Sequence, residues 1–330
     1  MVPDVPTQQL HSSSMESRAR GAVLGLAWAE SCGGRPGQTT WLSLALAGAL
    51  LERSRWSLGA WVCWLLAGQR FGVWRGGDRF LNEALMRLRR GEPPERTGFP
   101  TPRLGPAARV GTLGVLLRGD PPTLLEATMQ STLVTHADLR AGALAFAVAY
   151  AVARLVDGDE AVDVVGLLPD AVRGAEDAWS LPRQPLWERD QGAPHAVSEA
   201  LRGVFHAFPT ATRNRLDLAT LRAQVARHAR PHLPDGASTH ANGPFVLLGG
   251  VHGLAIALLT IRSPHDVLAS IRAQGGPDAS AVAAIAGTVL GARYGDTWIG
   301  AVPARVARWA EGIAGGVCTE DRDTFCRPPD

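Results

Sequence analysis

The apolar positions of this chain recur at helical spacing along almost its whole length. A period of two, which marks half-buried strands, is almost absent. Helices are predicted wherever the pattern holds, separated by stretches rich in proline and glycine. They cover residues 16–33, 38–53, 56–71, 82–90, 109–117, 122–133, 139–156, 159–178, 195–208, 216–229, 245–261, 263–273, 281–290 and 303–312. The pattern predicts an all-α fold with one helical domain over residues 16–312, an N-terminal tail at 1–15 and a C-terminal tail at 313–330.

Two of the predicted helices carry a small residue at every fourth position. These residues are Gly21, Gly25, Ala29 and Gly33 in the first helix, and Ala283, Gly287 and Gly291 in the second. On a helix, this spacing places all of them on one face. A face without large side chains allows another backbone to approach closely, so the two helices are predicted to form a central pair in direct contact.

The second of these helices follows a tight turn. Gly275 and Gly276 break the preceding helix, and Ser280 is expected to act as the N-cap. The N–H groups and the positive dipole end of such a helix suit an anion, whereas a plain loop-to-helix junction is the alternative interpretation. Two acids flank the pair, because Glu30 ends the first helix and Asp278 begins the second.

Composition narrows the possible partners. Of 330 residues, 46% are hydrophobic and 19% are charged, with a formal net charge of +2 and no long basic run, so we expect no nucleic-acid partner. The longest apolar run, residues 141–153, is too short to span a bilayer, so no membrane segment is expected. Four scattered cysteines and an N-terminus without signal-peptide features favour a cytoplasmic protein. The pattern does not indicate an oligomeric state.

Two N-terminal motifs of the chain resemble those of the ADP-ribosylglycohydrolase family. The family's glycine-rich first helix ends in Gly-Asp-Ala-x-Gly, and residues 29–33 (Ala-Glu-Ser-Cys-Gly) occupy that place. Its Thr-Asp-Asp-Thr motif, which leads a helix rich in leucine and alanine, falls on residues 37–40 (Gly-Gln-Thr-Thr). The following residues, 44–52, continue the match.

Three further motifs follow in the family's order. Its Gly-Ala-Ala-Met-Arg segment falls on residues 105–109 (Gly-Pro-Ala-Ala-Arg), and its Thr-His-x-Asp segment on residues 135–138. Its last motif, Gly-Gly-Asp-Thr-Asp-Thr, falls on residues 275–280 (Gly-Gly-Pro-Asp-Ala-Ser), with residues 291–295 continuing the likeness. The resemblance covers about residues 16–312 and implies the family's all-α fold and its action on ADP-ribosyl groups.

The departures from the family's pattern fall on its metal site. The family binds two magnesium ions through paired aspartates of the second and last motifs, where this chain has Gln38, Thr39, Pro277 and Ala279. Magnesium requires oxygen ligands and is usually held by carboxylates. The resemblance therefore implies a scaffold that has lost its magnesium ligands, and we expect no metal and no other cofactor.

The motif positions define a set of expected site residues. Glu30 is expected to activate water, and Asp278 to act as an acid or a stabiliser. The expected ligand-binding residues are Gln38, Thr39, Thr40, Gly105, Arg109, His136, Gly275, Gly276, Ser280 and Tyr294. Structural roles are the alternative for Arg109 and His136, because a lone arginine often forms an ion pair and a lone histidine often forms a hydrogen bond in the core.

Three functions are compatible with these residues. The first is metal-independent hydrolysis of a glycosidic bond in an ADP-ribosyl or nucleoside-type substrate, which carboxylates can perform without an ion. The second is a catalytically inactive relative that binds a ligand or a protein partner. The third is recruitment of the emptied site for other chemistry on a small metabolite.

Overall fold

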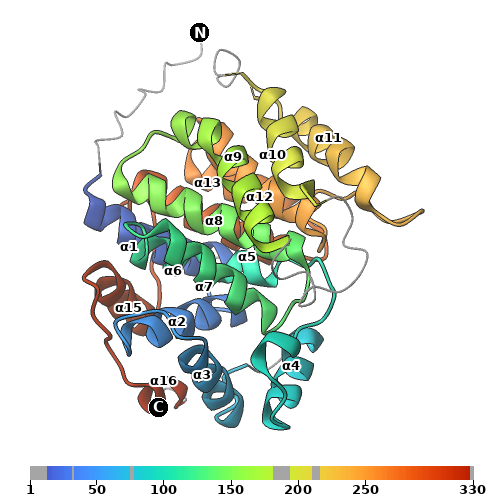
Figure 1. Cartoon of the computed structure of the whole chain (residues 1–330). Coiled ribbons are helices and arrows are strands. Elements are labelled where there is room, and N and C mark those ends of the chain that lie inside the picture. Colours follow the sequence, from blue (N-terminus) through green and yellow to red (C-terminus); the bar gives the residue numbers. More distant parts are fainter. Residues whose placement is uncertain (1–12, 32, 75–77, 181–193, 210–215, 328–330) are drawn as a thin grey trace.

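The described part of the chain is built from helices (Figure 1). This computed structural model describes residues 13–31, 33–74, 78–180, 194–209 and 216–327. The helices are α1 (Met15–Ser31), α2 (Gln38–Leu51), α3 (Leu58–Arg70), α4 (Arg79–Arg89), η1 (Pro94–Arg96), α5 (Gly105–Arg109), α6 (Gly111–Leu116), α7 (Pro121–Leu133), α8 (Leu139–Asp157), α9 (Ala161–Ser180), α10 (Ala196–His206), α11 (Leu218–Ala229), η4 (Arg230–His232), η5 (Val246–Gly250), α12 (Val251–Leu259), α13 (Pro264–Gln274), α14 (Ala279–Tyr294), α15 (Ala304–Ala314) and α16 (Arg322–Cys326). These residues form no β-strand, only the isolated bridges Phe99–His136 and Arg103–Phe245. The all-α prediction is confirmed.

Helix α8 lies at the centre of the fold. It contacts α5, α6, α7, α9 and α14, and in Figure 1 it runs between α2 and α3 on one side and α9 to α12 on the other. Its length and apolarity would suffice to cross a membrane, but 83% of its most apolar window is buried inside the protein. Helix α8 is therefore a core helix of this fold.

Helices α1 and α14 pack backbone against backbone, as their small residues predict. A Cβ atom added to Gly25 would overlap the carbonyl oxygen of Gly287, and one added to Gly291 would overlap that of Gly21. Across the same contact, the hydroxyl of Thr288 donates to the carbonyl of Ala22 at 2.9 Å. These contacts run in opposite orders along the two helices, so the pair is antiparallel.

Polar contacts close both ends of this pair. At one end, Asp296 accepts hydrogen bonds from the hydroxyl of Ser17 at 2.6 Å and from Nε of Arg20 at 2.8 Å. At the other end, Arg272 donates to the carbonyl of Ala29 at 3.1 Å. The end of α1 and the start of α14, which carry the motif residues, therefore lie at the same end of the molecule.

Among the predicted boundaries that differ from the structure, three matter most for the fold. Gly33 lies after α1 and has a φ of +77°, so it ends the helix instead of extending its small face. The expected helix over residues 109–117 is two short helices, α5 and α6. The expected C-terminal tail contains α16, because Phe325 and Cys326 are buried against the core. Most of the expected N-terminal tail, residues 1–12, lies outside the described residues.

A buried carboxylate joins α9 to α10. Glu176 is 1% exposed, and it accepts hydrogen bonds from the amide of Val197 at 3.0 Å and the hydroxyl of Ser198 at 2.6 Å. Burial raises the pKa of Glu176 to about 7, a shift that these hydrogen bonds oppose and the charge of Glu199 reinforces. The imidazole of His195 faces the carboxylate, with Nδ1 at 3.8 Å from it and Nε2 at 3.5 Å from Asp177.

The glycine contact generates the first prediction. We expect Gly25→Ala and Gly287→Ala each to lower the free energy of unfolding by more than about 3 kcal/mol, because the added methyl group meets immovable backbone. The matched control is Gly166→Ala on α9, where a Cβ meets nothing. There the substitution should stabilise the helix by about 0.5–1 kcal/mol. Urea unfolding measures all three, and equal effects at the three positions would contradict the direct contact of α1 with α14.

The second prediction concerns pH. A folded-state pKa raised from 4.5 to about 7 means that the fold favours the protonated carboxyl of Glu176. Its contribution is therefore present below pH 4.5 and is lost as pH rises through 7, a loss on the order of 1–3 kcal/mol. Glu176→Gln stays neutral, so its stability relative to wild type should rise between pH 5 and 8 by about that amount. Thermal melts of both proteins across this range measure the difference, and parallel pH profiles would contradict it.

Candidate functional site

Glu30 closes the N-terminus of α2. Its carboxylate accepts hydrogen bonds from the amides of Thr39 and Thr40, both at 2.9 Å, and from the hydroxyl of Thr40 at 2.6 Å. Gly37 occupies the N-cap position but has no side chain to offer, and a Cβ there would overlap the carboxylate. Glu30 thus satisfies donors at the positive end of a helix dipole. To act as a general base, the carboxylate of Glu30 would have to lose one or more of these hydrogen bonds.

The residues expected to bind ligand beside Glu30 face the same helix end. Thr40 is buried through its hydrogen bond to the carboxylate, and Thr39 is half-buried. Gln38 is also half-buried, and its side-chain nitrogen is enclosed without a hydrogen-bond partner among the described residues. The amide of Gln38 is therefore the group at this helix end that has unused hydrogen-bonding capacity.

A double-glycine turn leads into α14. Gly275 and Gly276 have φ angles of +64° and +110°, which an L side chain rarely adopts. The buried amide of Asn242 ties this turn to the end of α13, since it donates to the carbonyls of Ile271 at 2.8 Å and Gly275 at 2.7 Å. The oxygen of the same amide faces Nδ1 of His252 at 3.0 Å.

The prediction that Ser280 caps this helix is wrong. Asp278 holds the N-cap position, and Ser280 is the exposed second residue of α14. The backbone N–H of Asp278 already donates to Asn242 at 3.2 Å, and that of Gly275 donates to Arg272 at 2.8 Å. Pro277 has no N–H. Because these groups are used or missing, the turn offers an anion fewer donors than its glycines suggest.

Arg109 and His136 are buried next to each other. Arg109 donates to the carbonyl of Ser131 at 3.0 Å and to the hydroxyl of Thr135 at 2.9 Å, and burial lowers its pKa to about 10. Nδ1 of His136 lies 2.9 Å from the same hydroxyl. Burial, reinforced by the charges of Arg109 and Arg103, lowers the pKa of His136 well below its usual value, so the imidazole is neutral at pH 7.

Two aspartates face this cluster from different helices. Asp78 caps α4 through the amide of Phe80, and its other oxygen lies 3.8 Å from Nε2 of His136. Asp278 is half-buried, and burial raises its pKa against the opposing charge of Arg103, with the charge of Asp78 adding to the increase. Gly105 lies within 4 Å of both Asp78 and His136, measured from its ideal Cβ position. The site thus places two carboxyl groups and a neutral imidazole near the guanidinium groups of Arg103 and Arg109.

A cavity of about 730 Å³ opens beside this cluster. Its lining residues are Thr101, Pro102, Arg103, Arg140, Pro231, His232, Leu233, Pro234, Pro244 and Phe245. Arg140 is fixed there by a two-pronged contact with Asp138, at 3.1 Å from Nε and 2.8 Å from Nη2, and its guanidinium lies 5.6 Å from the ring centre of Phe245. Arg103 lines the cavity and also acts on Asp278, so it joins the cavity to the carboxyl cluster.

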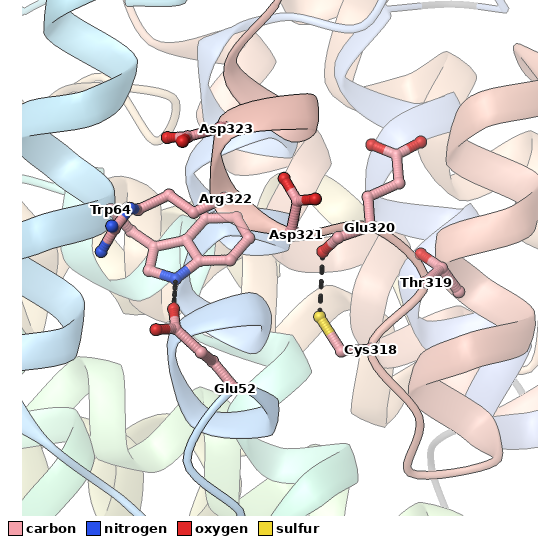
Figure 2. Close-up of a pocket in the computed structure, with 8 residues that line it drawn as sticks. All are labelled: Glu52, Trp64, Cys318, Thr319, Glu320, Asp321, Arg322 and Asp323. Carbon is pink, nitrogen blue, oxygen red and sulfur yellow. Dashed lines mark hydrogen bonds between the residues drawn. The ribbon is translucent and has the colours of Figure 1, made fainter.

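A second cavity, of about 430 Å³, lies at the other end of α2 (Figure 2). There the indole of Trp64 donates to Glu52 at 2.7 Å, and the thiol of Cys318 donates to the carbonyl of Glu320 at 3.1 Å. Its lining carries four carboxylates and one guanidinium. A 14-residue helix separates it from the Glu30 cap by about 20 Å. The cavity is therefore remote from the motif residues and unsuited to phosphate.

The structure sorts the expected residues into groups. Gly105, Arg109, His136 and Asp278 lie in one cluster, and Gln38, Thr39 and Thr40 surround Glu30. Tyr294 ends α14, about 24 Å along the helix from Asp278, and takes no part in either group.

Sequence reasoning missed several site residues. Asp78 had a usable signal, because an aspartate directly before an amphipathic run is a typical N-cap. Asn242, Arg103 and Arg140 reach the site from loops and helix starts whose placement depends on the whole fold.

The family's two magnesium ions do not fit the side chains present. Gln38 turns an amide nitrogen inward, Thr39 offers a hydroxyl, and Pro277 and Ala279 offer no ligand atom. The described residues include no group of three or more histidine, cysteine or acidic side chains arranged to hold an ion. A two-ion site needs several carboxylate oxygens in octahedral arrangement, which this set does not supply.

Comparison with known proteins agrees with the fold. The sequence model described as ADP-ribosylglycohydrolase matches residues 11–326. A solved structure titled "ADP-ribosylglycohydrolase-related protein complex" superposes with a TM-score of 0.51 at 20% identity, covering 92% of this chain and 97% of that one. No curated protein matches the chain. Since the family model spans nearly all of the sequence and the helical architecture agrees, this chain belongs to the ADP-ribosylglycohydrolase family.

Proposed function

We propose that this chain binds a ligand related to ADP-ribose or to a nucleoside in the cavity lined by Arg103 and Arg140. The observation that carries the proposal is the position of Arg103, which belongs both to the cavity wall and to the cluster around Asp278. A volume of about 730 Å³ suits a small-molecule site. A ligand whose charged part meets the guanidinium groups would place its far end at the carboxyl cluster.

The chemistry of the wall favours a phosphate-bearing ligand with a flat ring. Asp138 uses only Nε and Nη2 of Arg140, so further guanidinium N–H groups are left for phosphate oxygens. The ring of Phe245 provides an apolar face for a base. Burial, with the charge of Arg140 adding to it, lowers the pKa of His232, so this side chain is a neutral hydrogen-bonding group.

In this proposal, arginine takes over the charge balance that the family obtains from magnesium. Asp278 keeps an acid at the start of α14, and Arg103 opposes its charge. The positions that hold metal-binding aspartates in the family carry Gln38, Thr39, Pro277 and Ala279. Ligand binding should therefore be insensitive to chelators.

Hydrolysis of a glycosidic bond is the second candidate function, and the raised pKa of Asp278 favours it. A carboxyl group with a raised pKa holds its proton to higher pH and can donate it to the leaving group, while a second carboxylate accepts a proton from water. Asp78 is the better candidate for this base, because only one of its oxygens caps α4, whereas both oxygens of Glu30 are hydrogen-bonded at the start of α2. The water oxygen would bond to the anomeric carbon as the bond to the leaving group breaks.

The binding proposal predicts the response of Arg103→Ala. We expect its affinity for ADP-ribose to fall about ten- to a hundredfold, because a charged hydrogen-bond donor is lost. Arg262→Ala, which removes an exposed guanidinium from the loop between α12 and α13, is the matched control and should bind like wild type. Calorimetry with and without EDTA measures both effects. Loss of wild-type binding on chelation, or equal binding by Arg103→Ala and wild type, would refute the proposal.

The hydrolytic candidate predicts a difference between the two acids. If wild type releases the aglycone from ADP-ribosyl or nucleoside substrates, Asp278→Asn should abolish turnover while its melting temperature stays within a few degrees. Glu30→Gln should retain turnover but melt lower, because it weakens the cap by about 1 kcal/mol. Chromatographic product assays measure the turnover of each variant, and thermal melts measure its stability. Turnover lost only in Glu30→Gln would assign the base to Glu30, and no turnover by wild type would leave ligand binding as the function.

A further inference from the structure

Beside the candidate site, three arginines are held against two phenylalanine rings on the outer side of the fold. The guanidinium groups of Arg79 and Arg103 lie 4.8 and 5.4 Å from the ring centre of Phe80, and that of Arg87 lies 4.2 Å from the ring centre of Phe99. The two rings lie 5.7 Å apart. We call these five residues the arginine–phenylalanine surface.

The guanidinium groups on this surface form no ion pair with a carboxylate within 4 Å among the described residues, although the charge of Arg103 acts on Asp278 from farther away. By contrast, Arg20 pairs with Asp296 at 2.8 Å and Arg305 with Glu320 at 2.7 Å. A ring face attracts a guanidinium but leaves its N–H edge free for further hydrogen bonds. Arg79 and Arg103 are exposed, and Arg87 is half-exposed.

The segment that carries this surface has a net positive charge. Residues 78–103 contain six arginines against four acidic residues. Of these acids, Asp78 is turned toward His136 and caps α4, whereas Glu83 is exposed on α4. Two like charges over one ring repel each other, and an anionic partner would remove that repulsion.

The surface is continuous with the candidate site. The ring of Phe80 lies 6.3 Å from that of His136, and Arg103 lines the 730 Å³ cavity. A macromolecule seated on the surface would therefore hold a covalently attached group at the cavity mouth. The cavity is large enough for the attached group, and the charge of the surface suits an anionic macromolecule.

From this geometry we propose that the arginine–phenylalanine surface docks an acidic protein segment, the carrier of the ligand bound in the cavity. The carrier role rests on the proposed function, but docking of the acidic segment does not. Carboxylates of a flexible segment would pair with the outward N–H edges of Arg79, Arg87 and Arg103, while its backbone passes over the two rings. Binding would weaken with rising salt, because the charges are exposed.

Fluorescence anisotropy with a labelled glutamate-rich peptide tests the docking. We expect wild type to bind the peptide at low salt, and Arg79→Glu and Arg87→Glu each to weaken that binding about tenfold, since each reversal replaces attraction with repulsion. Arg262→Glu is the matched control, and it should change affinity less than about twofold. Circular dichroism melts confirm that each variant is folded.

Several outcomes would overturn the inference. They are no peptide binding by wild type, equal weakening by Arg262→Glu and Arg79→Glu, or tighter binding of a single-stranded oligonucleotide of equal charge, which would replace the protein segment with nucleic acid. ADP-ribose titrations of the same variants keep the two proposals apart, because neither Arg79 nor Arg87 lines the cavity. Peptide binding without ADP-ribose binding would refute the proposed function alone, and the converse would refute the docking alone.

Discussion

The direct contact between α1 and α14 is the constraint on which the rest of the structure depends. Glycines at 21, 25, 287 and 291 let two helix backbones meet with no side chain between them. Since the helices are antiparallel, the end of one and the start of the other reach the same end of the molecule. Glu30 and Asp278 lie at that end for this reason, and α5 carries Gly105 into position by packing against α14. The contact of α1 with α14 therefore both supports the fold and positions the residues of the site.

The polar groups of the site differ in how many hydrogen bonds they make within the protein. Glu30, Arg109 and Asn242 make several hydrogen bonds each and stabilise helix ends and turns. Arg103, Asp78 and Asp278 make fewer hydrogen bonds within the protein, and Arg103 lines the cavity. In this site the charge of Arg103 opposes that of Asp278, and the charge of Asp78 opposes that of Arg109.

The sequence predicted what depends on local pattern and on spacing. Helical periodicity identified the elements, and glycines four residues apart identified the central helix pair. Sequence could not predict that the carboxylate of Glu30 turns onto α2, because this depends on the short turn around Gly37. It also assigned the cap of α14 to Ser280, since serine is a common N-cap, whereas the left-handed glycines before Asp278 start the helix earlier. Arg103 and Arg140 meet across the cavity from segments far apart in the chain, which no local pattern records.

The cap formed by Glu30 has a consequence for restoring the family's chemistry. Aspartates reintroduced at positions 38 and 39 would add negative charge beside a carboxylate that already occupies the N-terminus of α2. Without an ion to neutralise them, three carboxylates would repel one another at close range, and the helix end would be weakened. Aspartates at positions 38 and 39 would therefore need a bound cation to balance their charge.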